Sequence, residues 1–403
     1  MSSIFTLVGY EYKKLILRRS TWIVISLTIL ITLFSCFGDV LGTVYVEGEP
    51  VGSHYEQMII DRDYARKLTG REIDEALISE MQEAYSLVPE GTLYTASEEY
   101  QTYARPYYPI YNLVRKVTRE FLNADGSELN ELELDGSRYY ELRKEAIQKK
   151  LEKGFLTDIE VKEHLERIEQ VKTPFVFEYA DGYSSIIRRM YTIGILLTMA
   201  LATCIAPVFA NEIANKTDQL ILTSRWGKNK VILAKLFTGM TFGFIMTIVV
   251  LLVLVFPTLC IYGFDGWKAP LQLWDVMTTY PVTALEAVLI LCGLAVASSM
   301  MITGLSLYLS AKLKNAAAVV TSISFLTILI MYISIPDQYR FLSQLVRGLP
   351  NNIMDISMAF TDYFVLIFGK CIPLYQTVPV IYGFVIVLLL VFGYRSFKNH
   401  QIG

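Results

Sequence analysis

Side chains that could perform covalent or metal-dependent chemistry are few in this sequence and are poorly placed for it. The three histidines, His54, His164 and His400, all lie outside the long apolar stretches, and none has the HExxH spacing of a zinc protease. Ser306 lies within an apolar stretch that contains no histidine, and a serine nucleophile needs an adjacent base. We therefore expect no catalytic residue and no metal site.

Phosphate binding is the second kind of chemistry that the sequence could offer. The pairs Gly227-Lys228 and Gly369-Lys370 lack the upstream glycine and the following serine or threonine of a P-loop. The cysteines have no metal-ligand spacing either; they are Cys36, Cys204, Cys260, Cys292 and Cys371. We therefore expect the chain to bind no cofactor and to have no ATP site of its own.

The composition points instead to a membrane. Of the 403 residues, 53% are hydrophobic and 19% are charged, and the mean hydropathy is +0.40; an average soluble chain is about 25% charged. The net charge of −3 hides a division, because residues 39–185 hold 30 acidic and 17 basic residues and the rest of the chain carries +10. This pattern argues against a cytosolic enzyme, a nucleic-acid-binding protein and a disordered chain.

Six apolar stretches are long enough to cross a bilayer, which takes about 20 helical residues. They are residues 22–37, 191–210, 231–256, 284–310, 315–335 and 377–394. Lysine and arginine gather before the first stretch, after the second, after the fourth and after the sixth. Because such residues favour the inner side of a membrane, we expect both termini in the cytoplasm. The acidic block, which has no cysteine, would lie outside, and this suits a bacterial plasma membrane.

The sequence therefore predicts an all-α polytopic membrane protein with six transmembrane helices and a mainly helical extracellular domain. Residues 1–38 would form an interfacial helix and the first span, residues 39–185 the extracellular domain, and residues 186–403 the remaining spans. In the third span, Gly239 and Gly243 have the GxxxG spacing that permits close helix packing.

Helix signals recur through the acidic block. Two pairs have the spacing of capping boxes, namely Thr69 with Glu72 and Thr157 with Glu160. Three apolar residues four apart predict one buried stripe, namely Ile73, Leu77 and Met81. Residues 138–153 predict a further helix, whereas residues 87–111, rich in tyrosine and proline, are expected to form a loop.

The N-terminal residues predict an amphipathic helix. Apolar residues recur every three to four positions at Ile4, Val8, Tyr12 and Leu15, and Glu11, Lys13 and Lys14 lie elsewhere on the helical wheel. A helix of this kind lies in the membrane interface before the chain turns into the first span.

The inner segment 211–230 has the most specific pattern. It predicts a short polar helix with Leu220 and Ile221 on one side, which suits docking on a partner. A Ser-Arg-Trp-Gly turn and a basic stretch then lead back towards Lys235 in the next apolar stretch.

With this segment, the chain resembles the permease subunit of an ATP-binding-cassette transporter, of the exporter class called ABC type 2. The resemblance covers nearly the whole chain and is strongest from Glu212 to Lys235. In the family this segment holds the coupling helix, which takes force from the ATPase. The resemblance implies that five residues meet the ATP-binding subunit: Glu212, Lys216, Asp218, Leu220 and Arg225. Relatives often have a Gly-Thr pair where this chain has Asn215-Lys216-Thr217.

The resemblance also implies partners and an activity. A second permease copy, identical or different, would enclose a path through the lipid membrane, and ATPase subunits would hold ATP and Mg²⁺. Antimicrobial peptides, drugs, lipids or ions would move outward. Residues 336–376 would contain short re-entrant or interfacial helices, and the apolar run 363–368 would be one of them.

A membrane sensor or receptor is the alternative, with the outer domain binding a ligand and the spans relaying the signal. Against it, the inner segments contain no signalling domain, and a simple relay needs fewer spans. A membrane enzyme is disfavoured because the catalytic constellations are missing.

Overall fold

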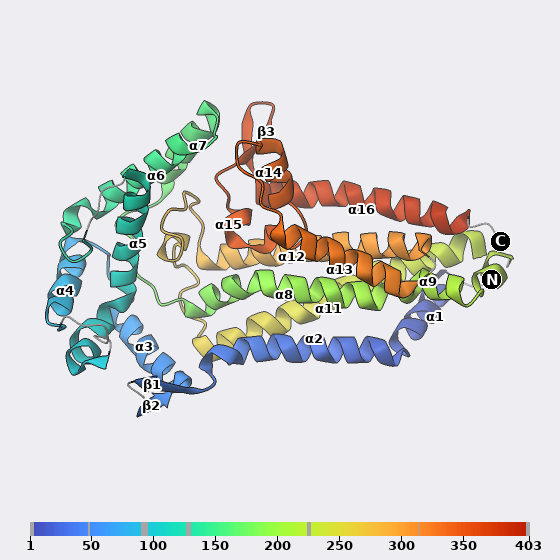
Figure 1. The fold of residues 1–403 in the computed structure, drawn as a ribbon, viewed down its shortest axis with the longest axis horizontal. Coiled ribbons are helices and arrows are strands. Elements are labelled where there is room, and N and C mark those ends of the chain that lie inside the picture. The colour runs from blue at the N-terminus through green and yellow to red at the C-terminus, as the bar shows by residue number, and fades with distance from the viewer. Residues whose placement is uncertain are drawn as a thin grey trace.

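The computed structural model describes residues 4–46, 49–89, 96–125, 130–223, 227–313 and 315–399. Within these residues the chain is built from helices, and its strands form two separate two-stranded sheets. Long helices lie side by side in one bundle, and a layer of shorter helices stands across one end of it (Figure 1). The expected all-α class is confirmed.

Five helices of the bundle are long and apolar enough to cross a membrane. They are α2 (Arg19–Phe37), α8 (Asp181–Ile205) with its continuation α9 (Pro207–Ala214), α11 (Ile232–Tyr262), α12 (Ala284–Lys312) and α16 (Leu374–Lys398). Large apolar side chains on these helices are exposed, among them Phe244, Leu252, Phe384 and Phe392. Because helices that are apolar on all sides are buried in a core or in a bilayer, the protein is a multi-pass membrane protein.

The apolar stretch 315–335 forms α13 (Ala316–Tyr332), which is shorter than the other helices of the bundle. Its 17 residues rise about 25 Å at 1.5 Å per residue, which is near the lower limit for a span. α13 packs against α8 and α12 (Figure 1).

α12 lies at the centre of the bundle and packs against α8, α11 and α16. The GxxxG residues of α11 face it. A methyl group added to Gly239 would lie 2.7 Å from the side chain of Leu307, and one added to Gly243 would lie 2.5 Å from Thr303 Oγ1. The close helix packing predicted from the glycine spacing is therefore confirmed.

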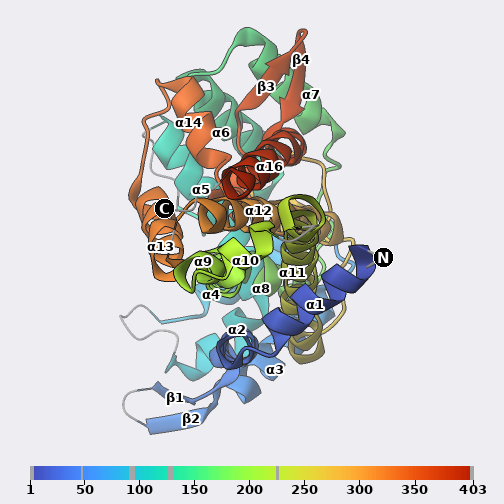
Figure 2. The same cartoon turned by 90° about the vertical axis from the view of Figure 1, so that its right-hand side faces the viewer.

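Both chain termini lie at the end of the bundle opposite the layer of shorter helices, called the terminal end below (Figure 1). There α1 (Ile4–Ile16) packs across α11, and α9 leads into α10 (Asp218–Thr223), as the end-on view shows (Figure 2). A π-helical turn, Gly227–Val231, returns the chain to α11. The predicted helix is confirmed in α1, where Leu15 is buried. The predicted separation of its faces is wrong for Glu11, because the Glu11 side chain is 10% exposed and pairs with Lys235 on the face that carries Leu15.

The layer of shorter helices, called the helical layer below, is formed by residues 54–89, 96–125 and 130–170. It contains α3 (His54–Leu68), α4 (Glu75–Ser86), α5 (Tyr108–Asp125), α6 (Tyr139–Lys153) and α7 (Asp158–Gln170), and a hairpin of β1 (Thr43–Val46) and β2 (Glu49–Ser53) precedes it. The stripe of Ile73, Leu77 and Met81 is fully buried, as predicted. The boundary expected at residue 185 falls inside α8, which begins at Asp181.

Single helical turns complete the described chain. They are Gly38–Val40, Tyr100–Ala104, Arg105–Tyr107, Gly136–Arg138, Leu271–Leu273 and Asn352–Met354. Two of them lie within residues 87–111, so the loop expected there is wrong for its second half. Tyrosine packing explains the difference, because Tyr100 is buried and Tyr111 stacks on Tyr85 with ring centres 4.3 Å apart.

One of the two predicted capping boxes is wrong. Thr157 and Glu160 cap α7 as expected. Thr69 instead lies at the C-terminal end of α3. The next helix starts later because the carboxylate of Asp74 accepts the backbone N–H of Leu77 at 2.9 Å and thus caps α4.

The segment before α16 is only partly helical. α14 (Arg340–Arg347) and α15 (Ile356–Ala359) are short helices, as the sequence predicts. The apolar run 363–368 is not a helix, because it contains β3 (Phe364–Ile367), which pairs with β4 (Lys370–Pro373) in an antiparallel hairpin.

The turn of this hairpin explains the wrong prediction. Phe368 and Gly369 have positive φ angles of 50° and 77°, which is the geometry of a two-residue hairpin turn. Val365 and Ile367 are β-branched and favour a strand. Run length alone does not separate such a strand from a short buried helix.

Gly243→Ala should destabilise the bundle. The added methyl group would overlap Thr303 Oγ1, and overpacking of this kind costs about 1–3 kcal/mol. Gly293→Ala in α12 is the matched control, because nothing lies within 4 Å of its added methyl group. Thermal unfolding in detergent should show a lower midpoint for Gly243→Ala alone. Equal midpoints for the two variants would contradict the packing of α11 on α12.

Candidate functional site

A buried group of charges joins α1, α9 and α11 at the terminal end of the bundle. Its centre is Lys235, in the first turn of α11, whose side chain is 1% exposed. The ammonium nitrogen lies 2.7 Å from Glu11 Oε2 of α1 and 2.6 Å from Glu212 Oε1 of α9. One cation therefore holds two carboxylates from helices that are far apart in the sequence.

Two further cations border this group. Lys14 Nζ donates to Glu11 Oε1 at 2.9 Å and to Glu212 Oε1 at 3.2 Å. Arg18, between α1 and α2, donates to the backbone carbonyl of Pro207 at 3.4 Å. The five charged residues are called the ionic cluster below: Glu11, Lys14, Arg18, Glu212 and Lys235.

Two contacts fix the face of α1 that carries its part of the cluster. Leu15 is four residues after Glu11, so both lie on one face of the helix, and Leu15 is buried. The hydroxyl of Tyr12 donates a hydrogen bond to Thr241 Oγ1 of α11. α1 therefore cannot turn about its own axis without breaking contacts with α11.

Because the ionic cluster is buried, breaking one of its ion pairs costs free energy. Two of its polar atoms nevertheless lack a hydrogen-bond partner within the described part of the chain. Removing one partner of a buried ion pair costs about 3–5 kcal/mol, because the other charge is left uncompensated. Among the described residues, Glu212 Oε2 and Arg18 Nη1 are buried without a hydrogen-bond partner. A small shift of α9 could therefore add a bond to the cluster as well as break one.

The cations around Glu11 keep its carboxyl group ionised. Burial alone would raise the pKa of Glu11, but the charges and hydrogen bonds of Lys235 and Lys14 outweigh burial and hold the pKa below its ordinary value of 4.5. Burial likewise opposes the charge of Lys14, yet its bonds to the two carboxylates raise its pKa above 10.5. Both groups are charged at neutral pH.

Beyond the ionic cluster, α9 leads to α10, where the sequence predicts a docking helix. Leu220 of α10 is 74% exposed. In the turn before α10, Lys216 is exposed and has a φ of 56°, a left-handed conformation that glycine adopts without strain.

The structure brings three of the eight predicted residues together. Glu11, Lys14 and Glu212 meet in the ionic cluster, so the carboxylate of Glu212 faces into the bundle. Of the other five, Lys13, Lys216 and Leu220 are exposed, Asp218 begins α10, and Arg225 lies outside the described residues. Contact of these residues with an ATPase stays a prediction.

Sequence patterns assign no role in this site to Lys235 or Arg18. Lys235 is a single charge near the start of an apolar stretch. A charge in such a stretch usually has a partner of opposite charge, and this pattern could have drawn attention to Lys235. The identity of the partners depends on how α1 and α9 pack, which no local pattern shows.

At the opposite end of the bundle, the helical layer is fixed to the loops between the long helices. Arg143 of α6 is 2% exposed and donates to two backbone carbonyls of the loop between α11 and α12, at 2.6 and 2.9 Å. His164 of α7 is buried between Thr279 Oγ1 and the backbone carbonyl of Asp362, each 2.7 Å away. Because a carbonyl only accepts, Nε2 of His164 carries the proton. Burial lowers the pKa of His164, so the ring is neutral.

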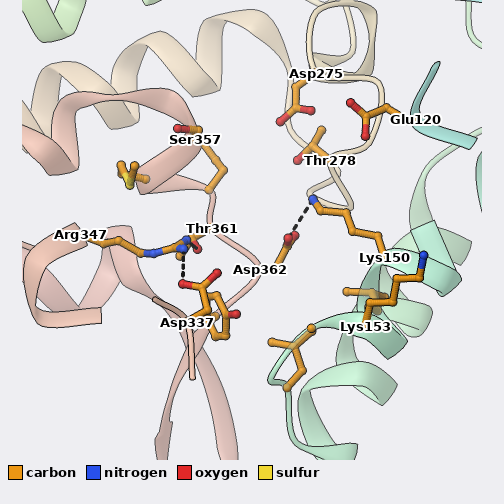
Figure 3. A pocket seen from close by; sticks show the side chains of 16 residues that line it. Glu120, Lys150, Lys153, Asp275, Thr278, Asp337, Arg347, Ser357, Thr361 and Asp362 are labelled. Carbon is orange, nitrogen blue, oxygen red and sulfur yellow. Dashed lines mark hydrogen bonds and ion pairs between the residues drawn. The ribbon is translucent and has the colours of Figure 1, made fainter. Parts of the chain in front are cut away.

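A pocket of about 600 Å³ opens beside this junction (Figure 3). Its walls come from α5, α6 and the turn after it, the loop before α12 and the segment before α16. Lys150 pairs with Asp362 at 2.8 Å, and Arg347 pairs with Asp337 at 2.7 Å. The volume lies in the range of small-molecule sites, but these two ion pairs already join four of the charged residues of its walls to one another.

No cluster for metal chemistry is present in the part of the chain that the structure describes, since no three histidine, cysteine, aspartate or glutamate side chains are grouped to hold an ion. No family model matches the sequence, and no curated protein matches it. A functional assignment therefore depends on the geometry of the two ends of the bundle.

Glu11→Gln should destabilise the chain in a pH-dependent way. Hydrogen bonds to charged groups contribute about 1.5–3 kcal/mol, so the variant should melt below the wild type at pH 7. Because the pKa of Glu11 is lowered by folding, its contribution is complete above pH 4.5 and is lost as the pH falls through the lower folded value. Melting in detergent from pH 7 to pH 3 should show the two midpoints converging.

Glu141→Gln is the control for this pH series, because Glu141 is exposed on α6. It should match the wild type throughout. A difference between Glu11→Gln and wild type that is absent at pH 7, or that grows in acid, would show that the ionic cluster does not hold α1.

Proposed function

We propose that this chain is the permease subunit of an ATP-driven exporter of the ABC type 2 class, and that a separate ATPase docks on α10. The observation that supports the proposal most is the position of the ionic cluster. The cluster ties α9, the helix that leads to the exposed α10, to α1 and α11. A simple connecting loop has no need of a buried lysine between two carboxylates.

α10 has the properties of a docking helix. Leu220 offers an exposed apolar contact, and apolar anchors near the centre of an interface carry much of its binding energy. Lys216 and Lys228 are exposed on either side of α10 in the sequence. Their charges would orient a partner with an acidic groove.

A force on α10 would reach the bundle by two routes. Only Ala206 separates α8 from α9, so a tilt of α9 would tilt α8. Lys235 would carry the same displacement to α1 and α11, because the buried charges cannot separate without a cost of several kcal/mol. Closure of the ATPases on ATP would then move these helices together.

The unsatisfied oxygen of Glu212 supports two arrangements of α9. A buried acceptor without a donor costs about 1–3 kcal/mol. An arrangement that brings Glu212 Oε2 to Arg18 would recover that cost and give the cluster a second stable state. A transporter needs two such states of similar free energy, which ATP binding can bias.

In this proposal the chain has six spans, with α13 as the fifth. α1, which carries Lys13 and Lys14, and α10, which Lys216 and Lys228 flank in the sequence, lie at the terminal end (Figure 2), and the inner side of a membrane favours such basic residues. Both termini would therefore be cytoplasmic, and the helical layer would lie outside a bacterial plasma membrane. α13 would span at the lower limit of helix length.

A second permease copy, identical or different, would complete the path for the substrate. The substrate would be a peptide, drug, lipid or ion that moves outward, and no nucleic acid takes part. ATP and Mg²⁺ would bind to the partner ATPases. This chain would supply the path and the coupling, not catalysis.

Leu220→Ser should weaken ATPase binding about tenfold, which corresponds to about 1.4 kcal/mol of lost apolar contact. Leu17→Ser is the matched control, because Leu17 is 69% exposed in the turn after α1 and lies outside α10. Affinity purification of tagged chains from native membranes would compare the recovered ATPase. Equal recovery from both variants would contradict docking on α10. Absence of any ATPase with the unmodified chain would contradict the proposed function.

A further inference from the structure

Two small elements project sideways from the bundle where α16 begins. They are α14 and the β3–β4 hairpin, and Figure 1 shows them beside the start of α16, at the end that carries the helical layer. Together they are called the brim below. The coupling of α10 to an ATPase does not involve the brim, so a role for the brim is independent of the proposed function.

α14 is amphipathic with its faces reversed relative to a helix in a soluble protein. Phe341, Leu342 and Leu345 are exposed, and Phe341 is 75% exposed. The polar residues of α14 face inward, where Ser343 donates to Asp337 Oδ1 at 2.8 Å. Two more inward bonds join Gln344 to the carbonyl of Phe364 at 2.9 Å and Arg347 to Asp337 at 2.7 Å. The outward face of α14 therefore suits an apolar environment.

The tip of the hairpin has the same character. Phe368 is fully exposed, and its neighbours Leu366 and Ile367 are each 40% exposed. Lys370 is exposed on the other side of the turn. An apolar tip with an adjacent cation is the composition of elements that bind the interface of a bilayer.

The chain connections hold the brim at the level of that interface. β4 ends at Pro373 and α16 begins at Leu374, so the tip at Phe368 is six residues from a membrane-spanning helix. At about 3.3 Å per residue, the tip lies within about 20 Å of the start of α16. α13 ends at Tyr332, just before α14.

We propose that the brim rests on the lipid surface at this end of the bundle, with Phe368, Ile367 and Phe341 in the headgroup and upper acyl region. Lys370 would lie beside lipid phosphates. In this proposal the brim meets lipid outside the spanning helices, as a hairpin and a reversed amphipathic helix.

The brim is also bonded to the helical layer, so a contact of the brim with lipid would affect the position of that layer. Glu160 of α7 pairs with Arg340 of α14 and accepts the backbone N–H of Phe364 at 3.0 Å. Cys371 of β4 lies against the backbone carbonyl of Ile159. A brim held in the lipid interface would therefore hold α7, and through it the helical layer, at a fixed height above the membrane.

Phe368→Trp tests the lipid contact. The full chain would be reconstituted in nanodiscs of phosphatidylcholine with or without bromine on the acyl chains, and the wild-type tryptophan emission would be subtracted. Because interfacial side chains enter about 5–10 Å into the headgroup and acyl boundary, the added emission should be blue-shifted and reduced about twofold by the brominated lipid. Tyr103→Trp in the helical layer is the control, because Tyr103 is 49% exposed there, and its emission should not respond to bromine.

Two results would overturn the proposal. Emission from Phe368→Trp at the wavelength of tryptophan in water, unchanged by bromine, would place the tip in solvent. A blue-shifted emission that bromine does not quench would show that a second copy of the chain, not lipid, covers the tip. Because the Phe368 side chain is fully exposed, the variant should fold as the wild type does, and its melting midpoint checks this.

Discussion

The burial of one ammonium group constrains the terminal end of this protein more than any other feature. Lys235 lies inside the bundle, where a charge is stable only with compensating partners, and two carboxylates from separate helices supply them. The position of α1 on α11, the direction in which α9 leaves α8, and the place where α10 emerges all depend on this requirement. The cluster joins three segments that are far apart in the sequence, in addition to the contact of Tyr12 with Thr241 between α1 and α11.

The opposite end of the bundle depends on a different kind of bond. There the helical layer is attached by polar groups that reach the backbone of the loops, such as Arg143 on the loop before α12 and Glu160 on the start of β3. Backbone contacts of this kind fix position without requiring a particular partner side chain. The layer is therefore held firmly relative to the long helices, and a displacement that begins at the terminal end would reach it through the helices themselves.

Much of the fold could be predicted from local pattern. The correct predictions depend on interactions within one helix. They are the long apolar runs, the buried stripe of Ile73, Leu77 and Met81, and the capping box at Thr157. The predictions of secondary structure are wrong where a contact between residues distant in the sequence determines the local conformation. The tyrosine-rich residues 87–111 gain helical turns because rings stack on α4, and the run 363–368 pairs with a strand that comes after it.

The candidate site divides in the same way. Glu11, Lys14 and Glu212 could be selected from their spacing and from the family resemblance, and the exposure of Leu220 agrees with a docking role. Lys235 is a conspicuous charge in an apolar stretch, but its role as the link between α1 and α9 requires knowing that both helices reach α11. Glu212 shows the limit most clearly, because the same carboxylate suits an outward contact in sequence and faces inward in the fold.

The central claim is that Lys235 carries motion from α9 to α1. Hydrogen–deuterium exchange of α1 in the chain reconstituted with the proposed ATPase partner, with and without ATP, measures this directly in the wild type and in Lys235→Met. The account predicts that ATP changes the protection of α1 amides in the wild type and leaves α1 unchanged in the variant. An identical ATP response of α1 in both proteins would contradict it.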